Sequence, residues 1–213
     1  MDTIKSKYHE TLAATVIKNL EKRQMEGYYC PTVEDAEKLA FSFLKDGQNV
    51  SFGGSMTLEE TGMLTALRHD PSIHLIDRST AKTPDETKKM YHDALSSDVY
   101  FMSTNAITTG GELVNIDGTG NRVAALIYGP ETVVILAGMN KIAANVDEAL
   151  SRVHNVATAQ NCIRLDKKTP CAITGACADC LSPDCICNQV VITRRSGIKG
   201  RIKVLLIGES FGY

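Results

Sequence analysis

The chain has 213 residues, of which 43% are hydrophobic, and a formal net charge of −2 at pH 7. This length is enough to bury the core of one domain, so we predict a single domain over 1–213. The Lys and Arg residues are scattered, which disfavours nucleic acid as a partner, and no apolar run approaches the ~18 to 20 residues that span a bilayer.

The first predicted element is an amphipathic helix within 1–26, because apolar residues recur at helical spacing from Ile4 to Leu20. Short apolar strands then alternate with helices. Strands are predicted at 28–30, 49–52, 73–76, 99–102, 112–116, 132–137 and 203–207. Further helices are predicted from Thr32 onward and at 57–69, 84–96 and 146–156. This alternation is typical of an α/β fold with a Rossmann-like layered, parallel or mixed sheet flanked by helices.

Six of the seven cysteines lie between residues 162 and 187. Cys177 and Cys180 form a Cys-x2-Cys pair, a spacing that brings two sulfurs to one ion, and soft thiolates suit zinc and iron. Residues 165–190 have little periodic pattern, so a bound metal ion or cluster would be needed to hold them in a defined fold. The sequence therefore predicts a metal-binding segment with zinc or an iron-sulfur cluster.

Disulfides are the alternative for these cysteines. They need an oxidising compartment, whereas the chain starts without an apolar signal stretch, so we expect a cytoplasmic protein with reduced thiols. Cys30 and Cys162 lie outside the tight cluster, and the default for both is burial as small apolar residues. The five histidines show no His-x3-His pairing, and we assign them no role.

The strand predicted at 49–52 runs into a glycine turn and then a helix. Open α/β sheets bind ligands at such carboxyl ends of strands, where backbone amides and close approach at glycine suit an anion. As an alternative, Thr57 and Glu60 form a capping box, which leaves Glu59 free. The candidate ligand-binding residues here are Gly53, Gly54, Ser55 and Thr57.

Residues 103–122 form a second polar stretch after the strand predicted at 99–102. Its small hydroxyls, amides and glycines suit a ligand site, although Asp117-Gly118 and Gly120-Asn121 are also ordinary turn sequences. A guanidinium such as that of Arg122 binds carboxylate or phosphate through two parallel hydrogen bonds. The candidate ligand-binding residues are Asn105, Asn121, Arg122 and Lys141, the last of which follows a later strand and a glycine.

Four motifs carry a family resemblance. They read Gly-Gly-Ser-Met-Thr-Leu-Glu-Glu at 53–60, Ser-Thr-Asn-Ala-Ile-Thr at 103–108, Asn-Ile-Asp-Gly-Thr-Gly-Asn-Arg at 115–122 and Tyr-Gly-Pro at 128–130. In these motifs the chain resembles the lactate utilization (LUD) domain family, and above all its compact anaerobe-type members with Cys-rich tails. Their tail pattern implies that the metal ligands are Cys171, Cys177, Cys180 and Cys187, with Cys185 as an extra thiol and possible substitute.

The resemblance also implies a fold similar to those of ribose phosphate isomerase, glucosamine phosphate deaminase and CoA transferases, which carry a phosphate or CoA site at a glycine loop. Related lactate utilization proteins act beside iron-sulfur redox subunits in oxidising L-lactate to pyruvate. This likeness of fold does not by itself assign a reaction.

Three functions remain open at this point. In the first, the chain is a lactate-utilization-type accessory protein of lactate and pyruvate metabolism, with a small anionic ligand at the Gly53 loop and a metal or iron-sulfur cluster at the cysteines. In the second, it is an isomerase or acyl/CoA-transferase-like enzyme on a phosphorylated or CoA substrate, with Glu59, Glu112 or Asp117 as base or nucleophile. In the third, it is a non-catalytic binding protein with structural zinc. The sequence leaves open whether the N-terminal helix packs on its own core or on a second copy in a homodimer.

Overall fold

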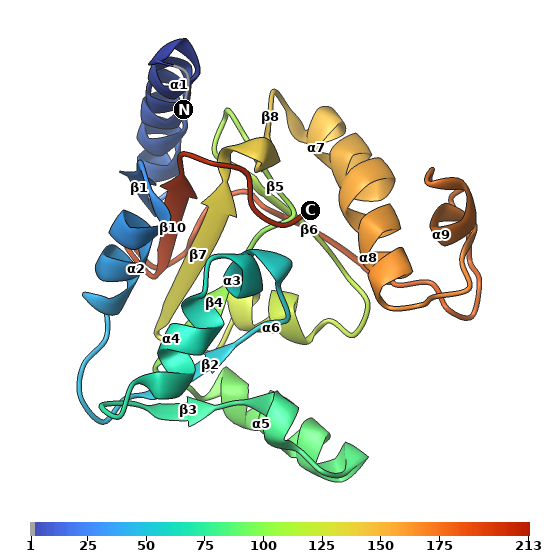
Figure 1. The fold of residues 1–213 in the computed structure, drawn as a ribbon, viewed down its shortest axis with the longest axis horizontal. Helices are drawn as coiled ribbons and strands as arrows, with labels where there is room; N and C mark the ends of the chain where they lie inside the picture. Colours follow the sequence, from blue (N-terminus) through green and yellow to red (C-terminus); the bar gives the residue numbers. More distant parts are fainter. Residues whose placement is uncertain (1–2) are drawn as a thin grey trace.

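A six-stranded sheet forms the centre of the molecule in the computed structural model, which describes residues 3–213 (Figure 1). All its neighbouring strands are parallel, in the order β1-β10-β7-β4-β2-β3. The strands are β1 (Glu26–Cys30), β2 (Asn49–Phe52), β3 (His74–Ile76), β4 (Val99–Met102), β7 (Thr132–Gly138) and β10 (Ile202–Ile207). The predicted α/β class with a parallel sheet is confirmed.

Both faces of this sheet are buried, as β7 illustrates. Val133 and Ile135 belong to the hydrophobic core on one face, whereas Val134 and Leu136 belong to the core on the other. Successive side chains of a strand point to opposite faces, so a run of apolar residues gives a strand that is covered on both sides.

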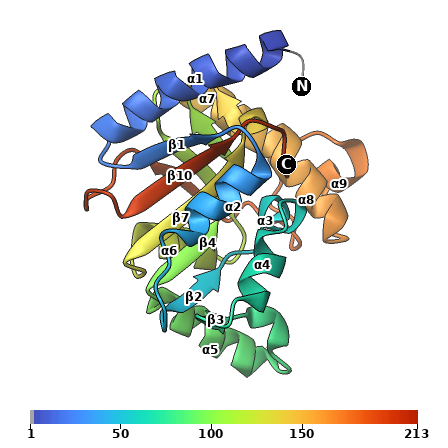
Figure 2. The ribbon, with the colours of Figure 1, turned by 60° about the vertical axis from the view of Figure 1, so that its left-hand side comes forward.

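Helices cover the two faces. The first face packs against α1 (Thr3–Lys22), α5 (Pro84–Leu95) and α6 (Asn121–Ile127). The second face packs against α2 (Val33–Phe41), α3 (Met56–Glu60) and α4 (Met63–His69). Figure 2 shows α1 lying over β1 and β10. The first two residues of the predicted N-terminal helix lie outside the described residues.

The helix predicted at 57–69 is two helices. Gly62 separates α3 from α4 and has a backbone φ of 74°, a left-handed value that glycine adopts without steric cost. The N-cap of α3 is Ser55, whose hydroxyl accepts a hydrogen bond from the backbone N–H of Leu58. Thr57 therefore lies inside the helix and does not form the capping box with Glu60.

A second, smaller sheet has the strand order β8-β5-β6-β9. Its strands are β5 (Ala106–Thr108), β6 (Leu113–Asp117), β8 (Ile142–Ala143) and β9 (Gln189–Thr193). It packs against the first part of a long helical run, which consists of α7 (Val146–Arg152), a π-helical segment η3 (Val153–Thr158) and α8 (Ala159–Arg164). The core residues of this contact come from α7 and η3. The sequence predicted β6 and the start of this helical run, and it missed β5, β8 and β9.

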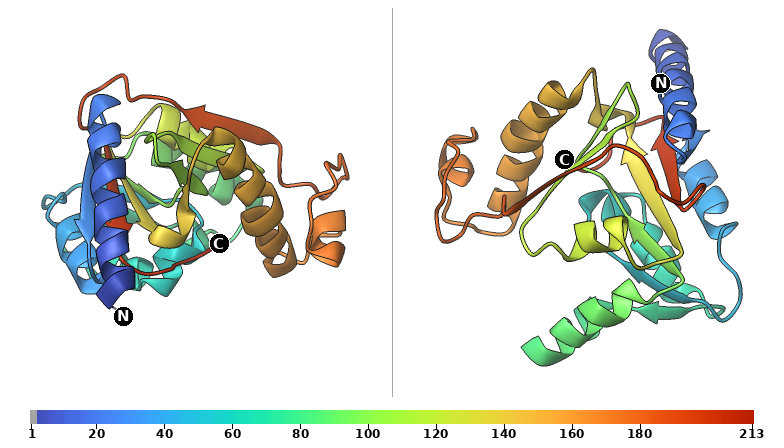
Figure 3. Two further views of the ribbon diagram at one scale, coloured as in Figure 1. Left: turned by 90° about the horizontal axis from the view of Figure 1, so that it is seen from above. Right: turned by 180° about the vertical axis from the view of Figure 1, so that it is seen from behind.

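The cysteine segment, residues 165–188, connects α8 to β9 and contains the short helix α9 (Pro170–Thr174). It lies on the outer side of α8, far from α1 (Figure 3). Because β9 pairs with β6, the C-terminal end of the segment is fixed to the small sheet. Within residues 3–213, no helix combines the length and the apolar character needed to cross a membrane.

Candidate functional site

Three neighbouring strands, β2, β4 and β7, end at the same edge of the large sheet and deliver polar residues to one cavity of about 450 Å³. β2 leads to Gly54 and Ser55, β4 leads to Ser103, and β7 leads to Lys141 through the short helix η2 (Met139–Lys141). The carboxyl ends of parallel strands meet at one edge of a sheet, which is why residues far apart in sequence gather here. The end of β6 and the helix α8 close the other side of the cavity.

The charged side chains that line the cavity are mainly basic. One acidic side chain, Asp117, faces five basic ones, which are Arg78, Arg122, Lys141, Arg164 and Lys167. An excess of positive charge in a concave site attracts anions. The cavity therefore suits a small molecule with a carboxylate or phosphate group.

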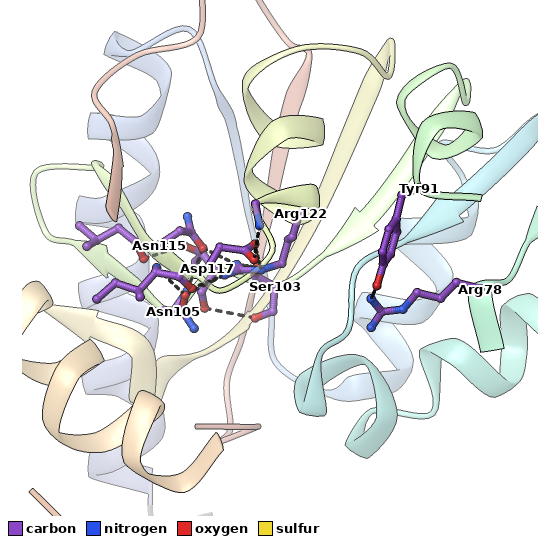
Figure 4. Close-up of polar contacts among 11 residues, drawn as sticks. Arg78, Tyr91, Ser103, Asn105, Asn115, Asp117 and Arg122 are labelled. Carbon is purple, nitrogen blue, oxygen red and sulfur yellow. Dashed lines mark hydrogen bonds and ion pairs between the residues drawn. The ribbon is translucent and has the colours of Figure 1, made fainter. Parts of the chain in front are cut away.

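Arg122 is held by protein groups on several sides (Figure 4). Its Nη1 donates to the carbonyl of Ser103 at 3.1 Å, and its Nη2 donates to Oδ1 of Asn105 and to the carbonyl of Ile116, both at 2.9 Å. Its Nε lies 3.4 Å from Oδ2 of Asp117. Burial lowers the pKa of this guanidinium. Arg122 consequently ties the end of β4 to β6, which shapes the cavity wall.

Lys141 is 4% exposed, and its Nζ donates to the hydroxyl of Ser103 at 3.1 Å. In the described part of the chain, no carboxylate lies within ion-pair distance of this ammonium. Burial, and then the charges of Arg152 and Arg122, lower the pKa of Lys141 to about 7, while Glu60 acts in the opposite direction. Lys141 is therefore a buried amine that is close to titration at neutral pH.

Arg78 lies in the short helix η1 (Arg78–Thr80), beside the glycine loop. Its Nη1 donates to the hydroxyl of Tyr91 at 2.9 Å, and its guanidinium carbon lies 5.6 Å from the centre of the Tyr91 ring. Figure 4 shows this pair apart from the Arg122 group. A Cβ added at Gly54 would lie directly against Nη2 of Arg78, so glycine leaves this edge of the guanidinium accessible.

Most residues predicted for ligand binding line this cavity. They are Gly54, Ser55, Thr57, Asn105, Asn121, Arg122 and Lys141, and the predicted catalytic candidate Asp117 joins them. Gly53 is not part of the lining; it is buried beside Arg122, and a Cβ added there would lie 3.1 Å from Cγ of that arginine. Glu59 is exposed and also lies outside the lining.

Glu112 lies outside the cavity lining, in the turn between β5 and β6. Its carboxylate forms an ion pair with Arg23, directly after α1, and accepts a hydrogen bond from the hydroxyl of Thr108. Arg23 also donates to the carbonyls of Gly110 and Arg194, both at 2.6 Å. These contacts give Glu112 a structural position, in which it fastens α1 to the small sheet.

Six cysteines surround a second cavity of about 30 Å³, beside α8. They are Cys162, Cys171, Cys177, Cys180, Cys185 and Cys187. Cys162 comes from α8 and lies 1% exposed, so it joins the five cysteines of the segment. His154 lines the same cavity, and its Nδ1 lies 3.6 Å from Sγ of Cys177. The sequence assigned neither Cys162 nor His154 to this group.

The donor chemistry of this thiol pocket fits zinc or an iron-sulfur cluster, because both are held by thiolates and zinc also accepts imidazole. Across residues 3–213, however, no three Cys, His, Asp or Glu side chains are gathered closely enough to hold one ion as they lie. Metal binding would thus require the thiols to move inward. Burial raises the pKa of Cys187 to about 12, whereas the backbone N–H of Ser182 lowers the pKa of Cys180.

The two cavities share a wall. Thr158, Cys185 and Ile186 line both the basic cavity and the thiol pocket. Cys185 is the thiol that the tail pattern treated as an extra, yet its position borders both sites. The backbone N–H of Cys187 donates to Sγ of Cys185 at 3.3 Å, and this contact joins two cysteines of the thiol pocket.

Sequence reasoning missed Arg78, Ser103 and Arg164 as parts of the site. Arg78 follows a three-residue strand and Arg164 ends a helix, so neither stands in a motif that indicates ligand binding. Ser103 lies in the polar stretch that the sequence singled out, directly after β4. Its position at a strand end was the one available signal.

Among the solved structures that resemble this chain, one matches over almost its full length. A crystal structure of a DUF162 family protein from Deinococcus radiodurans superposes with a TM-score of 0.54 at 11% identity, covering 93% of this chain and 98% of that chain. This likeness shows a shared fold.

Two further matches cover about half of the chain at 19% identity. They are eIF2B delta from Chaetomium thermophilum, with a TM-score of 0.34, 52% of this chain and 48% of that chain, and ribose 5-phosphate isomerase A from Methanocaldococcus jannaschii, with a TM-score of 0.33, 53% of this chain and 54% of that chain. No curated protein matches the sequence.

The sequence model of the LUD domain matches residues 13–207. This span begins within α1 and ends at the last residue of β10, so it includes both sheets, the thiol pocket and all of the basic cavity lining except Tyr213. The chain belongs to the LUD domain family.

Proposed function

We propose that this protein is a lactate-utilization-type accessory protein of organic-acid metabolism that binds a small anion in the basic cavity. The observation that carries the proposal is Lys141, a nearly fully buried amine that lines the cavity without a carboxylate partner among residues 3–213. A buried charge without a counter-ion is costly, and a bound carboxylate or phosphate would supply that counter-ion.

The surroundings of Lys141 support the same proposal. Arg78 forms no ion pair within the described residues, and Ser103 and Asn105 add hydrogen-bonding groups. A cavity of about 450 Å³ lies within the ~300 to 1,000 Å³ range of small-molecule sites. A short organic acid would fit there, and related iron-sulfur redox subunits are the partners that we expect for such an accessory protein.

Calorimetric titration with lactate, pyruvate and inorganic phosphate tests the anion site. At least one of these anions should bind to the wild type, and Lys141→Met should weaken binding by about tenfold or more, because a hydrogen bond to a charged group contributes about 1.5 to 3 kcal/mol. Lys89→Met is the matched control, since Lys89 pairs with Asp93 on the surface of α5. Equal affinities of the two variants would contradict the proposal.

We also propose that the thiol pocket binds zinc or an iron-sulfur cluster. The support is the gathering of six sulfurs from α8 and the cysteine segment around one small cavity. A structural metal commonly supplies folding energy where apolar packing is sparse. The segment fits that case, since Ile173 and Leu181 are 83% and 99% exposed.

Metal and acid-labile sulfide content, measured on protein purified without oxygen, test the thiol pocket. Iron with sulfide and a brown colour would identify a cluster and favour the redox accessory role. Zinc without colour would identify a structural staple. Protein that contains neither zinc nor iron, and that takes up neither during anaerobic reconstitution, would contradict this part of the proposal.

A further inference from the structure

We propose that Lys141 forms a reversible imine with a small carbonyl compound that carries a carboxylate or phosphate group and binds in the basic cavity. This inference rests on the proposed anion site and names the chemical class of its ligand. An amine that only neutralised an anion would accept any small acid, whereas imine formation selects a ketone or aldehyde.

The position of Lys141 suits a nucleophilic amine. It is the last residue of η2, the short helix that directly follows β7, a central strand of the large sheet. Its side chain is 4% exposed and lines the cavity, and its one hydrogen-bond partner among the described residues is the hydroxyl of Ser103. A side chain fixed in this way presents its nitrogen to a bound ligand without first breaking an ion pair.

The charges around Lys141 favour the neutral amine, which is the form that attacks a carbonyl carbon. Burial removes the ammonium from water, and Arg152 and Arg122 repel its positive charge. The pKa of Lys141 is lowered to about 7, so the neutral amine is accessible at neutral pH. An exposed lysine is almost fully protonated under the same conditions.

The reaction balances with the groups at hand. The lone pair of Nζ forms a bond to the carbonyl carbon while the C=O pair moves to oxygen, which takes a proton to give a carbinolamine. Loss of that hydroxyl with a nitrogen proton then releases water and leaves the C=N bond. The hydroxyl of Ser103, 3.1 Å from Nζ, is placed to pass a proton between nitrogen and oxygen. No oxidant or reductant is required.

Reductive trapping tests this inference with matched pairs of ligands. Borohydride is added to the protein with pyruvate or with its alcohol lactate, and separately with dihydroxyacetone phosphate or with its alcohol glycerol 3-phosphate. Intact mass and peptide mapping should show one reduced adduct at Lys141 with the carbonyl member of at least one pair and none with its alcohol. The pair that reacts distinguishes a carboxylate ligand from a phosphate ligand.

Two variants separate imine formation from charge. Lys141→Arg keeps a cation in the cavity but cannot form an imine, so the adduct should disappear. Lys89→Arg, on the surface of α5, should retain the adduct. Because the wild-type peptide map identifies the modified lysine directly, the test holds even if Lys141→Arg fails to fold.

Three results would overturn the inference and are distinguishable from one another. Lactate or phosphate binding without any adduct at Lys141 would leave the anion site standing and remove the imine. Absence of both binding and adduct would remove the anion site as well. Adducts spread over exposed lysines, in amounts unchanged by Lys141→Arg, would also count against the imine.

Discussion

Lys141 affects stability as well as binding, because its pKa differs between the folded and unfolded chain. The folded value is lowered from 10.5 to about 7 by burial and by neighbouring arginines. Between these two values the unfolded chain binds more protons than the folded one, so the free energy of unfolding rises with pH across this window. Each unit of lowering corresponds to about 1.4 kcal/mol.

Lys141→Met removes this dependence. We expect the variant to be more stable than the wild type at about pH 6, where the wild type buries an ammonium, and the difference to shrink by about pH 9. Urea unfolding at several pH values measures it. Since all other titrating groups are common to both proteins, parallel curves for the two proteins would contradict the lowered pKa.

Gly54 controls access to Arg78, which gives a second prediction for a single residue. An Asp at position 54 would place its carboxylate against Nη2 of Arg78 and withdraw that charge from the cavity. Gly54→Asp should therefore weaken anion binding by about tenfold or more. Gly197→Asp adds the same charge where a Cβ has no atom within 4 Å, so it serves as the control in the calorimetric titration. Equal losses in both variants would speak against a role for the Gly54 loop.

At the scale of elements, Glu112 joins α1 to the turn between β5 and β6. Glu112→Gln removes the ion pair with Arg23. The side chains of Arg23 and Glu112 are 23% and 19% exposed. We expect a loss of about 1 to 2 kcal/mol in the free energy of unfolding, measured in urea, and unchanged anion affinity. Unchanged stability together with lost affinity would return Glu112 to the site, where the sequence analysis considered it as a base or nucleophile.

The large sheet was predictable, because its short apolar strands alternate with helices that show a helical period. No α-helix separates β5 or β8 from the strand before it, so this alternation does not indicate them, and β9 follows directly on the cysteine segment. α6 begins in the glycine-rich turn that the sequence assigned to ligand binding. The strand order depends on packing between distant segments, which no local pattern records.

At the scale of the whole molecule, the residues of the candidate site were likewise predictable only where a local sequence pattern indicated them. The sequence located Gly54, Asn105 and Lys141 because each follows a strand, and parallel strands bring their carboxyl ends together. Arg78 and Cys162 line their cavities because of the way the chain folds around the sheet, and no local sequence pattern indicates this. Because Cys162 lies apart from the other cysteines in the sequence, nothing in the sequence distinguishes it from an ordinary buried residue.

Cys162 and Cys30 give a matched test of the thiol pocket, because both are nearly fully buried, at 1% and 2% exposed. Cys30 ends β1 in the core on the second face of the large sheet, whereas Cys162 lines the thiol pocket. If the pocket binds metal, Cys162→Ala should release metal and expose residues 165–188 to protease, since few apolar contacts hold that segment. Cys30→Ala should lose a similar amount of packing but keep both the metal and the protease resistance. Metal analysis combined with limited proteolysis compares the two variants. Equal behaviour of the two variants would mean that burial alone, and not a shared ion or cluster, holds the segment to α8.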